Sequence, residues 1–553
     1  MKNCDPGPFQ PQLGAIEPYP QHPSIQPLTR RCNKRSRKRW CRAGACSNIR
    51  GMGSGTLKAR LRGDAGGGAV PLDRRIYGQN LEFMGRQFAG GMQAESGSRA
   101  TRLEGDLRAD VRGALIDLGV THLRWPGGCY ADVYDWREGV GDARRLQPNA
   151  MWGDPQFGEL MLPPGAGPVE IGPDVDHRFG TAEFLDLCRA CGAEASLTAS
   201  MGGEGPQQAA EWVAWVRDNF GPEAVPVWGI GNEQFNQWEH NGCYEKPGRY
   251  VERFHLWAEA MRRENPGISC VASGGDESLY HDWNRVLLEG IGTEADYFSV
   301  HSYVPFFVHE LSGLSDSEGD YLAAATAGPC IEQNLQACIA HMQQVLGKAL
   351  PISFDEWNLL GSVSEFVLPV ATLREAVAVA GILNALHRLA ATVKIADQFA
   401  AVNGAAPPIL TDRDELARTP VYHVLRLYSR RSLDGIAPLE ISSPAYDSGA
   451  VGLLPARGEV AFLDASLSTG VDGVALFLVN RHPSESVQVE LEINGVRAGG
   501  EALLEVVSGP GHRACNLPGA PAEVETISRT LDWPGLLELA PCSVAALTTS
   551  ARG

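Results

Sequence analysis

The sequence predicts an α/β protein: a (β/α)8 barrel, then an antiparallel β-sandwich, with a disordered basic extension in front of both. Short apolar runs and helical patterns alternate strictly from residue 76 to residue 396. Strict alternation of strand and helix implies parallel strands joined by right-handed crossovers. Eight such units over roughly 330 residues are typical of a closed barrel. Beyond residue 409 short strands lie between Gly/Pro turns, which predicts antiparallel pairing.

The eight apolar runs are expected to form the barrel strands, and the helical patterns between them the outer ring. The runs cover residues 76–78, 122–124, 194–200, 225–230, 269–273, 297–300, 351–354 and 393–396. The clearest helical patterns cover residues 108–118, 207–218, 249–264, 331–346 and 373–390.

The C-terminal part contains one helical pattern and several strands. Residues 421–431 are expected to be helical, and strands are expected at 474–480, 487–492, 502–507 and 543–548. Residues 56–62 also alternate, so they are expected to add a strand to the same sandwich. The predicted organisation is an extension (1–54), a sandwich strand (55–72), the barrel (73–408) and the sandwich (409–553). The expected task of the sandwich is to cover a barrel flank or to make an oligomer contact, and carbohydrate binding is the less favoured alternative.

Composition and charge exclude several classes of protein. Hydrophobic residues make up 44% and charged residues 21%, as in soluble globular proteins. The longest apolar stretch, 376–386, is short and flanked by charges, so no membrane span is expected. The net charge is −18, although residues 1–65 hold 13 Lys and Arg against 3 Asp and Glu. The remainder is therefore strongly acidic and would repel nucleic acid, whereas a neutral ligand such as a sugar is compatible.

The N-terminal extension and the cysteines favour a cytoplasmic protein. No apolar core of a secretory signal precedes residue 54, and Met52 is an alternative start. Thirteen cysteines in such a chain are expected to be reduced thiols. Cys188 and Cys191 form a lone CxxC within a helical pattern and are expected to be packing residues. The sequence contains no Gly-rich phosphate loop and no ligand-spaced His/Cys cluster, so no metal and no cofactor are expected.

Polar residues follow the C-terminal ends of the predicted strands. The segments are 79–82 (QNLE), 124–129 (RWPGGC), 231–233 (GNE), 301–303 (HSY) and 355–358 (DEWN). In a barrel these ends meet at one mouth, where active sites are built. Converging carboxylates are expensive to bury, so their presence there indicates function.

Glu233 and Glu356 are the predicted catalytic pair. They follow the fourth and seventh strands, which lie across the mouth from each other in a closed barrel. Glycoside hydrolysis needs two carboxyl groups, one to protonate the leaving oxygen and one to stabilise or attack the anomeric carbon. A separation of about 5–5.5 Å predicts a retaining double displacement. The structural alternative for either residue is an ion pair with an arginine at the barrel rim.

Six segments resemble glycoside hydrolase family 51, a family of mostly α-L-arabinofuranosidases. They are 76–82 (IYGQNLE), 124–132 (RWPGGCYAD), 134–136 (YDW), 178–184 (RFGTAEF), 228–233 (WGIGNE) and 354–358 (FDEWN). Their order and spacing match from about residue 56 onward. The resemblance implies Glu233 as acid/base and Glu356 as nucleophile.

The same resemblance implies roles for the neighbouring residues. Asn232 would bind the sugar hydroxyl next to the anomeric carbon, and Glu82 would grip the outer hydroxyls. The remaining implied site residues are Arg124, His301 and Tyr303 around the nucleophile, Cys129 at the sugar, and Trp238 and Trp357 as stacking surfaces. The structural alternative for His301, Trp238 and Trp357 is that each is a buried residue of the core.

Departures from the family pattern concern the sugar pocket. Cys129 stands where many members have Asn, Phe235 where an Asp is common, and Ala400 where the family has a sugar-binding Gln. The favoured substrate is a terminal α-L-arabinofuranosyl group of a hemicellulose oligosaccharide. Another furanoside, a β-xyloside and an endo-acting β-glucanase stay open, as does a non-catalytic carbohydrate-binding protein. The expected partners are the carbohydrate substrate and, as in many relatives, further copies of the chain in a homo-oligomer.

Overall fold

The computed structural model describes residues 56–153, 171–237, 239–307, 314–496 and 499–550. The chain divides into two units, Met1–Cys46 and Ser47–Gly553. The first unit, and with it the predicted disordered extension over residues 1–54, lies outside the described residues.

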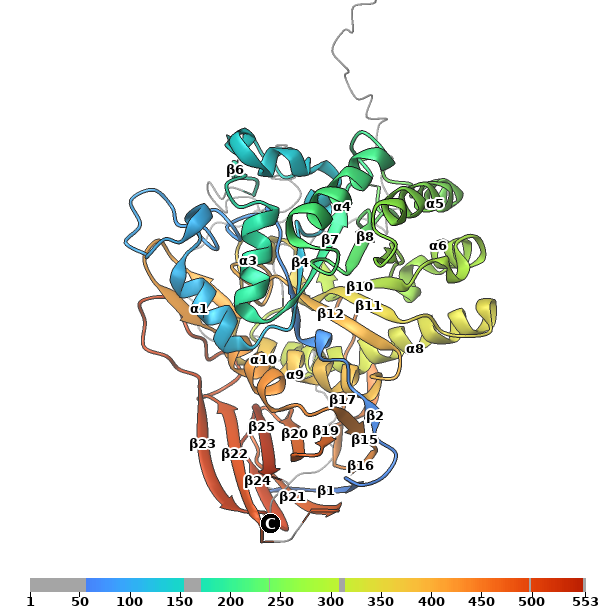
Figure 1. The fold of residues 1–553 in the computed structure, drawn as a ribbon. Coiled ribbons are helices and arrows are strands. Elements are labelled where there is room, and N and C mark those ends of the chain that lie inside the picture. The colour runs from blue at the N-terminus through green and yellow to red at the C-terminus, as the bar shows by residue number, and fades with distance from the viewer. Residues whose placement is uncertain (1–55, 154–170, 238, 308–313, 497–498, 551–553) are drawn as a thin grey trace, which may run out of the picture. The chain divides into compact units, whose positions relative to one another are not determined.

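Eight parallel strands close into a barrel, which confirms the predicted fold class (Figure 1). Around the barrel the order is β10-β11-β12-β3-β4-β7-β8-β9. The strands are β3 (Gly78–Asn80), β4 (His122–Trp125), β7 (Glu194–Ala199), β8 (Val227–Ile230), β9 (Ser269–Ala272), β10 (Tyr297–Phe307), β11 (Ile352–Ser362) and β12 (Val393–Phe399).

The first strand differs from its prediction. Residues 76 and 77 belong to a 3-10 turn, η1 (Arg74–Tyr77), and β3 begins at Gly78. The Asp73 side chain accepts the backbone N–H of Arg75 and so starts the turn. Ile76 and Tyr77 are buried there, which explains why their sequence looks like a strand.

The helices follow the predicted pattern and surround the strands. They are α1 (Ala109–Leu118), α3 (Thr181–Cys191), α4 (Pro206–Phe220), α5 (Pro247–Glu264), α6 (Glu277–Gly290), α7 (Glu318–Ala324), α8 (Ala327–Leu346), α9 (Leu373–Arg388) and α10 (Pro420–Arg431). Among the described residues, no helix has the length and apolar character that a membrane crossing needs.

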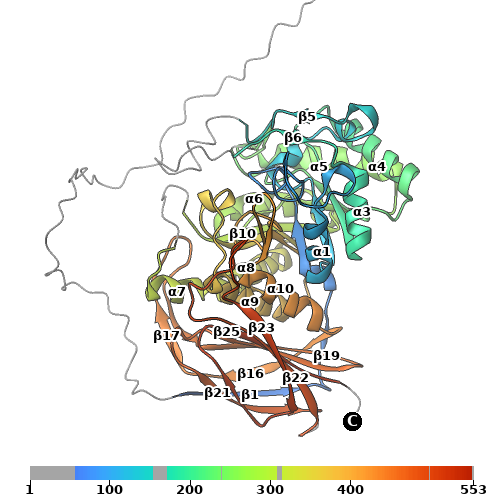
Figure 2. The ribbon, with the colours of Figure 1, turned by 90° about the vertical axis from the view of Figure 1, so that its left-hand side faces the viewer.

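Helix α9 is buried on all sides, which explains the longest apolar stretch of the sequence. Every residue from Leu373 to His387 is buried. In Figures 1 and 2, α9 and α10 lie between the barrel strands and the C-terminal sheets. Since both faces of α9 contact protein, its sequence lacks the polar stripe of a surface helix.

Two sheets follow the barrel. One has seven strands in the order β2-β15-β19-β20-β25-β22-β23, and the other has four in the order β16-β1-β21-β24. Their bounds are β1 (Leu57–Asp64), β2 (Val70–Pro71), β15 (Gly435–Ala437), β16 (Leu439–Ser442), β19 (Leu463–Gly470), β20 (Gly473–Asn480), β21 (Val487–Asn494), β22 (Glu501–Ser508), β23 (Glu525–Asp532), β24 (Leu536–Leu539) and β25 (Ser543–Ser550). The sheets pack closely: a methyl group added at Gly63 of β1 would lie 3.0 Å from Leu467 of β19.

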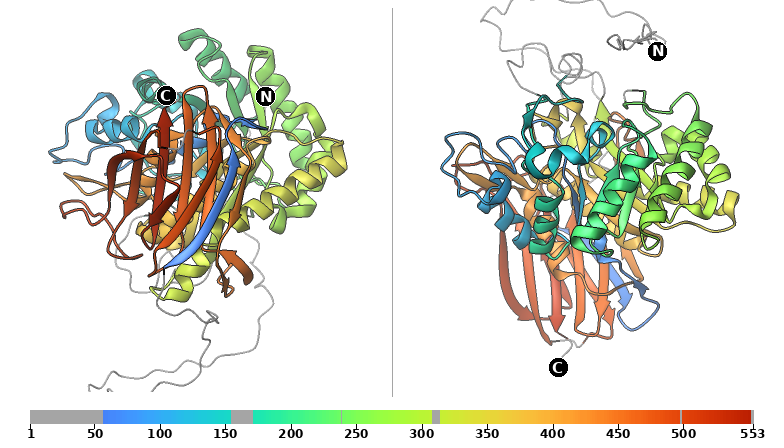
Figure 3. Two further views of the ribbon diagram at one scale, coloured as in Figure 1. Left: turned by 90° about the horizontal axis from the view of Figure 1, so that it is seen from below. Right: turned by 45° about the horizontal axis from the view of Figure 1, so that its top comes forward.

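Strand β1 makes the sheet mixed rather than purely antiparallel. It pairs antiparallel with β16 but parallel with β21. Figure 3 shows this blue strand from the start of the chain lying among the orange and red strands from its end. Because β1 enters from before the barrel and has no hairpin to either neighbour, no short turn forces an antiparallel pairing.

Candidate active site

Strands β10 and β11 carry the centre of the site. Both strands are eleven residues long. Their pairing continues as far as Phe307 and Ser362, and His301 lies opposite Glu356. In a regular strand neighbouring side chains point to opposite faces. A register shift between Phe354 and Trp357 breaks that alternation. Asp355 and Glu356 therefore both reach the polar cluster.

Glu356 is held by donors on both carboxylate oxygens. Arg124 Nη1 of β4 donates to Oε1 at 2.7 Å, and Tyr303 OH donates to Oε2 at 2.7 Å. Asn80 Nδ2, at the end of β3, lies 3.4 Å from Oε1. The Glu356 side chain is only 7% exposed. Fixed donors on both oxygens of a buried carboxylate hold it in one orientation.

Glu233, three residues past the end of β8, faces Glu356 across His301. His301 Nδ1 lies 2.8 Å from Glu233 Oε1 and 3.5 Å from Glu356 Oε2. One oxygen of each carboxylate and the His301 nitrogen lie within 4.8 Å of one another. Asn236 Nδ2 donates to the other oxygen of Glu233. Glu233 has φ +36°, a strained backbone for a residue with a side chain, and such strain is typical of functional positions.

His301 carries positive charge between the carboxylates. Burial opposes the imidazolium, but the charges of Glu356, Asp355 and Glu233 outweigh burial and raise the pKa of His301 to about 10. Asp355 Oδ1 lies 3.4 Å from His301 Nε2 and accepts a hydrogen bond from Ser299 at 2.6 Å. Asp355 thereby fixes the ring. Asp355 directly precedes Glu356 in the sequence but was not among the predicted site residues.

Glu82 is a further buried acid of the site. It follows β3 and accepts hydrogen bonds from the Tyr130 backbone N–H at 2.9 Å and from the Trp152 indole at 3.0 Å. Burial and the charge of Glu356 raise the pKa of Glu82 to about 8, against the lowering effect of these donors. Glu82 therefore holds a proton at neutral pH.

Asn232 and Cys129 complete the predicted sugar side. Arg124 Nη2 donates to Asn232 Oδ1 at 2.8 Å, and Asn232 Nδ2 lies 3.9 Å from Cys129 Sγ. Burial raises the pKa of the Cys129 thiol well above its usual value. The thiol is therefore neutral and acts only as a weak hydrogen-bonding group.

Two buried acids behind Asn232 were missed by sequence reasoning. Asp132 accepts the Asn232 backbone N–H at 3.0 Å and the Gln234 amide at 2.7 Å, and so supports the loop after β8. Glu239 lies with Cys129 and Glu233 in a group whose ligand atoms are within 4.8 Å of one another. Burial, with the charges of Asp132 and Glu233, raises the pKa of Glu239 well above its usual value. Asp132 ends a quoted motif, so it was detectable, whereas Glu239 carried no motif.

Trp357 and the changed pocket positions Phe235 and Ala400 are buried among apolar residues. Trp238 lies outside the described residues. Trp357 is 1% exposed and stacks on Phe354 with ring centroids 6.2 Å apart, so its position is that of a core residue. Phe235 packs against Tyr280 with ring centroids 4.2 Å apart and an interplanar angle of 41°, and Ala400 is fully buried. The prediction that Trp357 offers a face to sugar therefore does not fit its packing.

Two family models match this chain. The model of the α-L-arabinofuranosidase C-terminal domain matches residues 355–543, and that of the α-L-arabinofuranosidase 1 domain matches residues 114–306. Together they cover more than half of the chain.

Curated relatives and solved structures agree with these matches. An intracellular exo-α-L-arabinofuranosidase of Bacteroides ovatus is 26% identical over 79% of this chain and 84% of its own length. An intracellular exo-α-(1→5)-L-arabinofuranosidase of Halalkalibacterium halodurans is 26% identical over 79% and 88%. The α-L-arabinofuranosidase of Thermotoga maritima, solved as an arabinose complex, superposes with a TM-score of 0.75 at 25% identity over 89% and 100%. The family 51 enzyme of Thermotoga petrophila gives a TM-score of 0.76 at 24% identity over 89% and 100%.

The matched family models, the relatives and the superposed structures all carry the name α-L-arabinofuranosidase. One family model lies on the barrel, and the other runs from Asp355, beside Glu356, through the sandwich. The chain belongs to glycoside hydrolase family 51, the family of the α-L-arabinofuranosidases.

Proposed function

We propose that this protein releases terminal α-L-arabinofuranosyl residues from hemicellulose-derived oligosaccharides with retention of configuration. Glu356 is the nucleophile and Glu233 the general acid/base. The observation that carries the proposal is the approach of the two carboxylates to within 4.8 Å. Retaining glycosidases need about 5–5.5 Å between their carboxyl groups, and inverting enzymes about 6.5–9.5 Å.

The first step forms a covalent glycosyl-enzyme. A Glu356 oxygen attacks the anomeric carbon while Glu233 donates its proton to the leaving glycosidic oxygen. The bond from that carbon to the leaving group breaks, and its electron pair stays on the departing alcohol. Arg124 and Tyr303 hold Glu356 in the attacking orientation, and this alignment spares the entropy of orienting the reacting groups.

The second step returns the enzyme to its starting state. Glu233, now ionised, takes a proton from water, and the water oxygen attacks the anomeric carbon. The ester bond to Glu356 breaks, and the sugar leaves with its original configuration. His301, in contact with both carboxylates, compensates their charge as the proton moves between steps.

Burial of the catalytic groups supports action at chain ends. The Glu233 side chain is 14% exposed and that of Glu356 is 7% exposed. Glu82 and Asn232 supply further buried hydrogen-bonding groups. The names of both bacterial relatives include the prefix exo, which supports action on one terminal sugar.

We also infer a cytoplasmic location and imported oligosaccharides as substrates. All nine cysteines within the described residues are unpaired, as expected in a reducing compartment. The relatives of B. ovatus and H. halodurans are named intracellular. A homo-oligomer stays a prediction from the family resemblance.

Azide rescue of two variants tests the assignment of roles. With an activated aryl α-L-arabinofuranoside, Glu356→Ala is expected to give the β-configured glycosyl azide, because azide attacks in place of the missing nucleophile. Glu233→Ala is expected to give the α-azide, because azide replaces water in the second step. NMR of the products reads out the configuration. Exchanged product configurations would contradict the assignment.

A substrate panel tests the sugar and the mode of action. The wild type is expected to prefer 4-nitrophenyl α-L-arabinofuranoside over the β-D-xyloside and to release only monosaccharide from arabino-oligosaccharides. Faster cleavage of polymeric β-glucan than of any aryl arabinoside would reject the proposed substrate and end-acting mode.

A further inference from the structure

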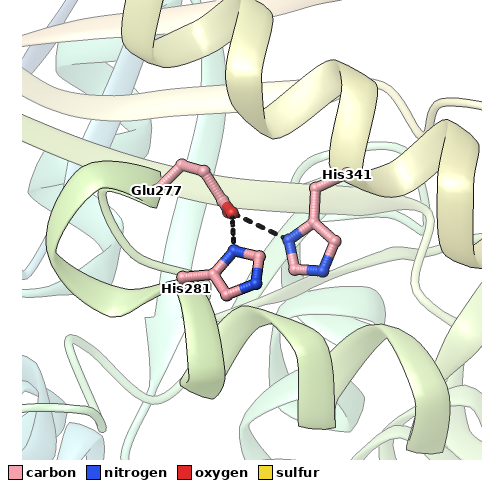
Figure 4. Close-up of side chains that lie close together, drawn as sticks. All are labelled: Glu277, His281 and His341. Atoms are coloured by element: carbon pink, nitrogen blue, oxygen red, sulfur yellow. Dashed lines mark hydrogen bonds and ion pairs between the residues drawn. The ribbon is translucent and has the colours of Figure 1, made fainter.

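Three metal-binding side chains converge between helices α6 and α8, outside the carboxylate cluster of the mouth. Glu277 and His281 lie one turn apart on α6, and His341 comes from α8 (Figure 4). One ligand atom of each lies within 4.8 Å of the other two. Both imidazole Nδ1 atoms face the same Glu277 oxygen, His341 at 2.9 Å and His281 in closer contact.

The arrangement is incomplete as a hydrogen-bonded cluster. The His341 side chain is 6% exposed, yet its Nδ1 makes no well-directed hydrogen bond with any described group. Such a buried nitrogen costs stability unless a partner is supplied. The two rings stack at 4.3 Å with an interplanar angle of 19°. Two positively charged rings at this distance repel each other, whereas two neutral imidazoles that bind one cation do not.

We propose that Glu277, His281 and His341 form a zinc-binding site. Two imidazole nitrogens and one carboxylate oxygen are a common ligand set for Zn²⁺, with a fourth position open to water. Glu277 Oε2 accepts a hydrogen bond from Asn284 Nδ2 at 2.8 Å, and such outer contacts orient metal ligands.

Binding requires the ligands to rearrange, because the lone pair of each imidazole lies in its ring plane and the two rings are stacked. Ligands at about 2.0–2.1 Å from a tetrahedral ion lie about 3.3 Å from one another, so the nitrogens must separate slightly from the Glu277 oxygen. The His281 side chain is 61% exposed and can rotate without disturbing the core. The same exposure opens a path for the ion from solvent.

The site is connected to the acid/base. Tyr280 lies between Glu277 and His281, at a point where α6 departs from helical geometry (φ −124°, ψ 32°). Tyr280 OH donates to Asn236 Oδ1 at 2.9 Å, and Asn236 donates to Glu233. A metal bound to both Glu277 and His281 would therefore fix the turn that contains Tyr280. Tyr280 in turn holds Asn236, which donates to Glu233.

Metal titration of the full-length protein tests the site. After removal of metals by a chelator, calorimetry is expected to show one strong Zn²⁺ site per chain that His281→Ala lacks. Cobalt(II) is expected to give the visible bands of a four-coordinate ion without the charge-transfer band of a thiolate ligand. Loss of a ligand is expected to weaken Zn²⁺ binding at least about 100-fold.

The matched control is His255→Ala. His255 Nδ1 lies 3.0 Å from Glu294 Oε2 in a surface pair that has no third ligand among the described residues. This variant is expected to bind Zn²⁺ as the wild type does. His341→Gln, with folding checked by circular dichroism, is expected to match His281→Ala.

Three results would overturn the proposal. They are absence of saturable Zn²⁺ binding in the wild type, binding by His281→Ala within threefold of the wild type, and a thiolate band in the cobalt spectrum. A thiolate band would assign the ion to a cysteine site such as that of Cys129. Glu356→Ala keeps the zinc site intact, so failure of the proposed activity and failure of the metal site are separate outcomes.

Discussion

At the residue scale, the site groups acids around two cations. Arg124 contacts Asp355 and Glu356, while His301 contacts those two and Glu233. Glu82, by contrast, has no cation in direct contact among the described groups. Burial and the charge of Glu356 raise its pKa to about 8, so it is protonated at pH 7.

Tyr303→Phe tests the hydrogen bond to Glu356, the proposed nucleophile. The change removes one donor to Glu356 Oε2 and keeps the ring in place. We expect kcat to fall about 10- to 100-fold with little change in Tm, since a charge-assisted bond contributes roughly 1.5–3 kcal/mol. Tyr244→Phe, at an exposed tyrosine, is the control. An unchanged kcat for Tyr303→Phe would contradict a role of Tyr303 in orienting the proposed nucleophile.

Glu82→Gln tests the cost of the buried acid. The pKa of Glu82 is raised from 4.5 to about 8 in the folded protein. Between these two pH values Glu82 loses its proton in the unfolded chain but keeps it in the folded protein, which lowers the free energy of unfolding. The neutral Gln removes that loss. We therefore expect Glu82→Gln to raise Tm relative to wild type at pH 8, and to raise it less at pH 4.5.

Activity gives the second readout for Glu82→Gln. If Glu82 grips the sugar, KM for the aryl arabinofuranoside rises while Tm at pH 8 does not fall. A lower Tm at pH 8 would show that the carboxyl group stabilises the fold, contrary to the prediction.

At the element scale, the barrel was predictable and several of its details were not. Strand and helix alternate in the sequence with the periods of the structure, and the polar residues at strand ends mark the mouth. The predicted start of β3 was wrong because Ile76 and Tyr77 are buried in a 3-10 turn, and burial alone does not distinguish a turn from a strand in the sequence. The parallel pairing of β1 was unpredictable because sequence pattern fixes which face is buried, not which neighbour pairs.

The proximity of Glu233 and Glu356 was predictable because each stands in a short motif directly after a barrel strand. The burial of Trp357 against Phe354 was not predictable, because its motif does not show which way the ring packs. The Glu277–His281–His341 cluster was invisible because His341 comes from another helix and lies 60 residues after His281. Only the packing of α6 on α8 brings them together.

Leu61→Ala tests the contribution of β1 to the sandwich. Leu61 is fully buried in the middle of β1, between β16 and β21. Removing its side chain is expected to lower stability by about 2–5 kcal/mol, because a cavity remains in the packed interface of the sheets. Lys58→Ala, exposed on the opposite face of β1, is expected to change Tm little. Equal Tm values for the two variants would contradict a structural role for β1.

At the scale of the whole second unit, the barrel and the sandwich meet at α9. His387 Nδ1 lies 2.8 Å from Ser466 Oγ of β19, and Arg388 Nη1 donates to Asp464 at 3.1 Å. Arg481, from just after β20, donates to the other Asp464 oxygen at 2.7 Å. Asp464 therefore joins a barrel helix to two sandwich segments through a buried carboxylate.

Asp464→Asn is expected to destabilise the protein without affecting its chemistry. The variant leaves Arg481, only 3% exposed, without its charge partner, and breaking a buried pair costs about 3–5 kcal/mol. The Tm is expected to fall by several degrees while kcat/KM at 25 °C stays that of the wild type. Asp472→Asn, an exposed residue in the turn between β19 and β20, is the matched control.

The pH dependence distinguishes charge from shape at this junction. Burial opposes ionisation of Asp464, but Arg481 and Arg388 outweigh it and lower the pKa of Asp464 below its usual value. An acid whose pKa is lowered in the folded protein stabilises the fold fully above its unfolded pKa of about 3.9. This stabilisation is lost as the pH falls through the folded pKa. The Tm gap between wild type and Asp464→Asn is therefore expected to be constant from pH 5 to 8 and to shrink below about pH 4. A gap of constant size down to pH 3 would mean that Asp464 acts through packing alone, because its charge would then contribute nothing to holding the barrel against the sandwich.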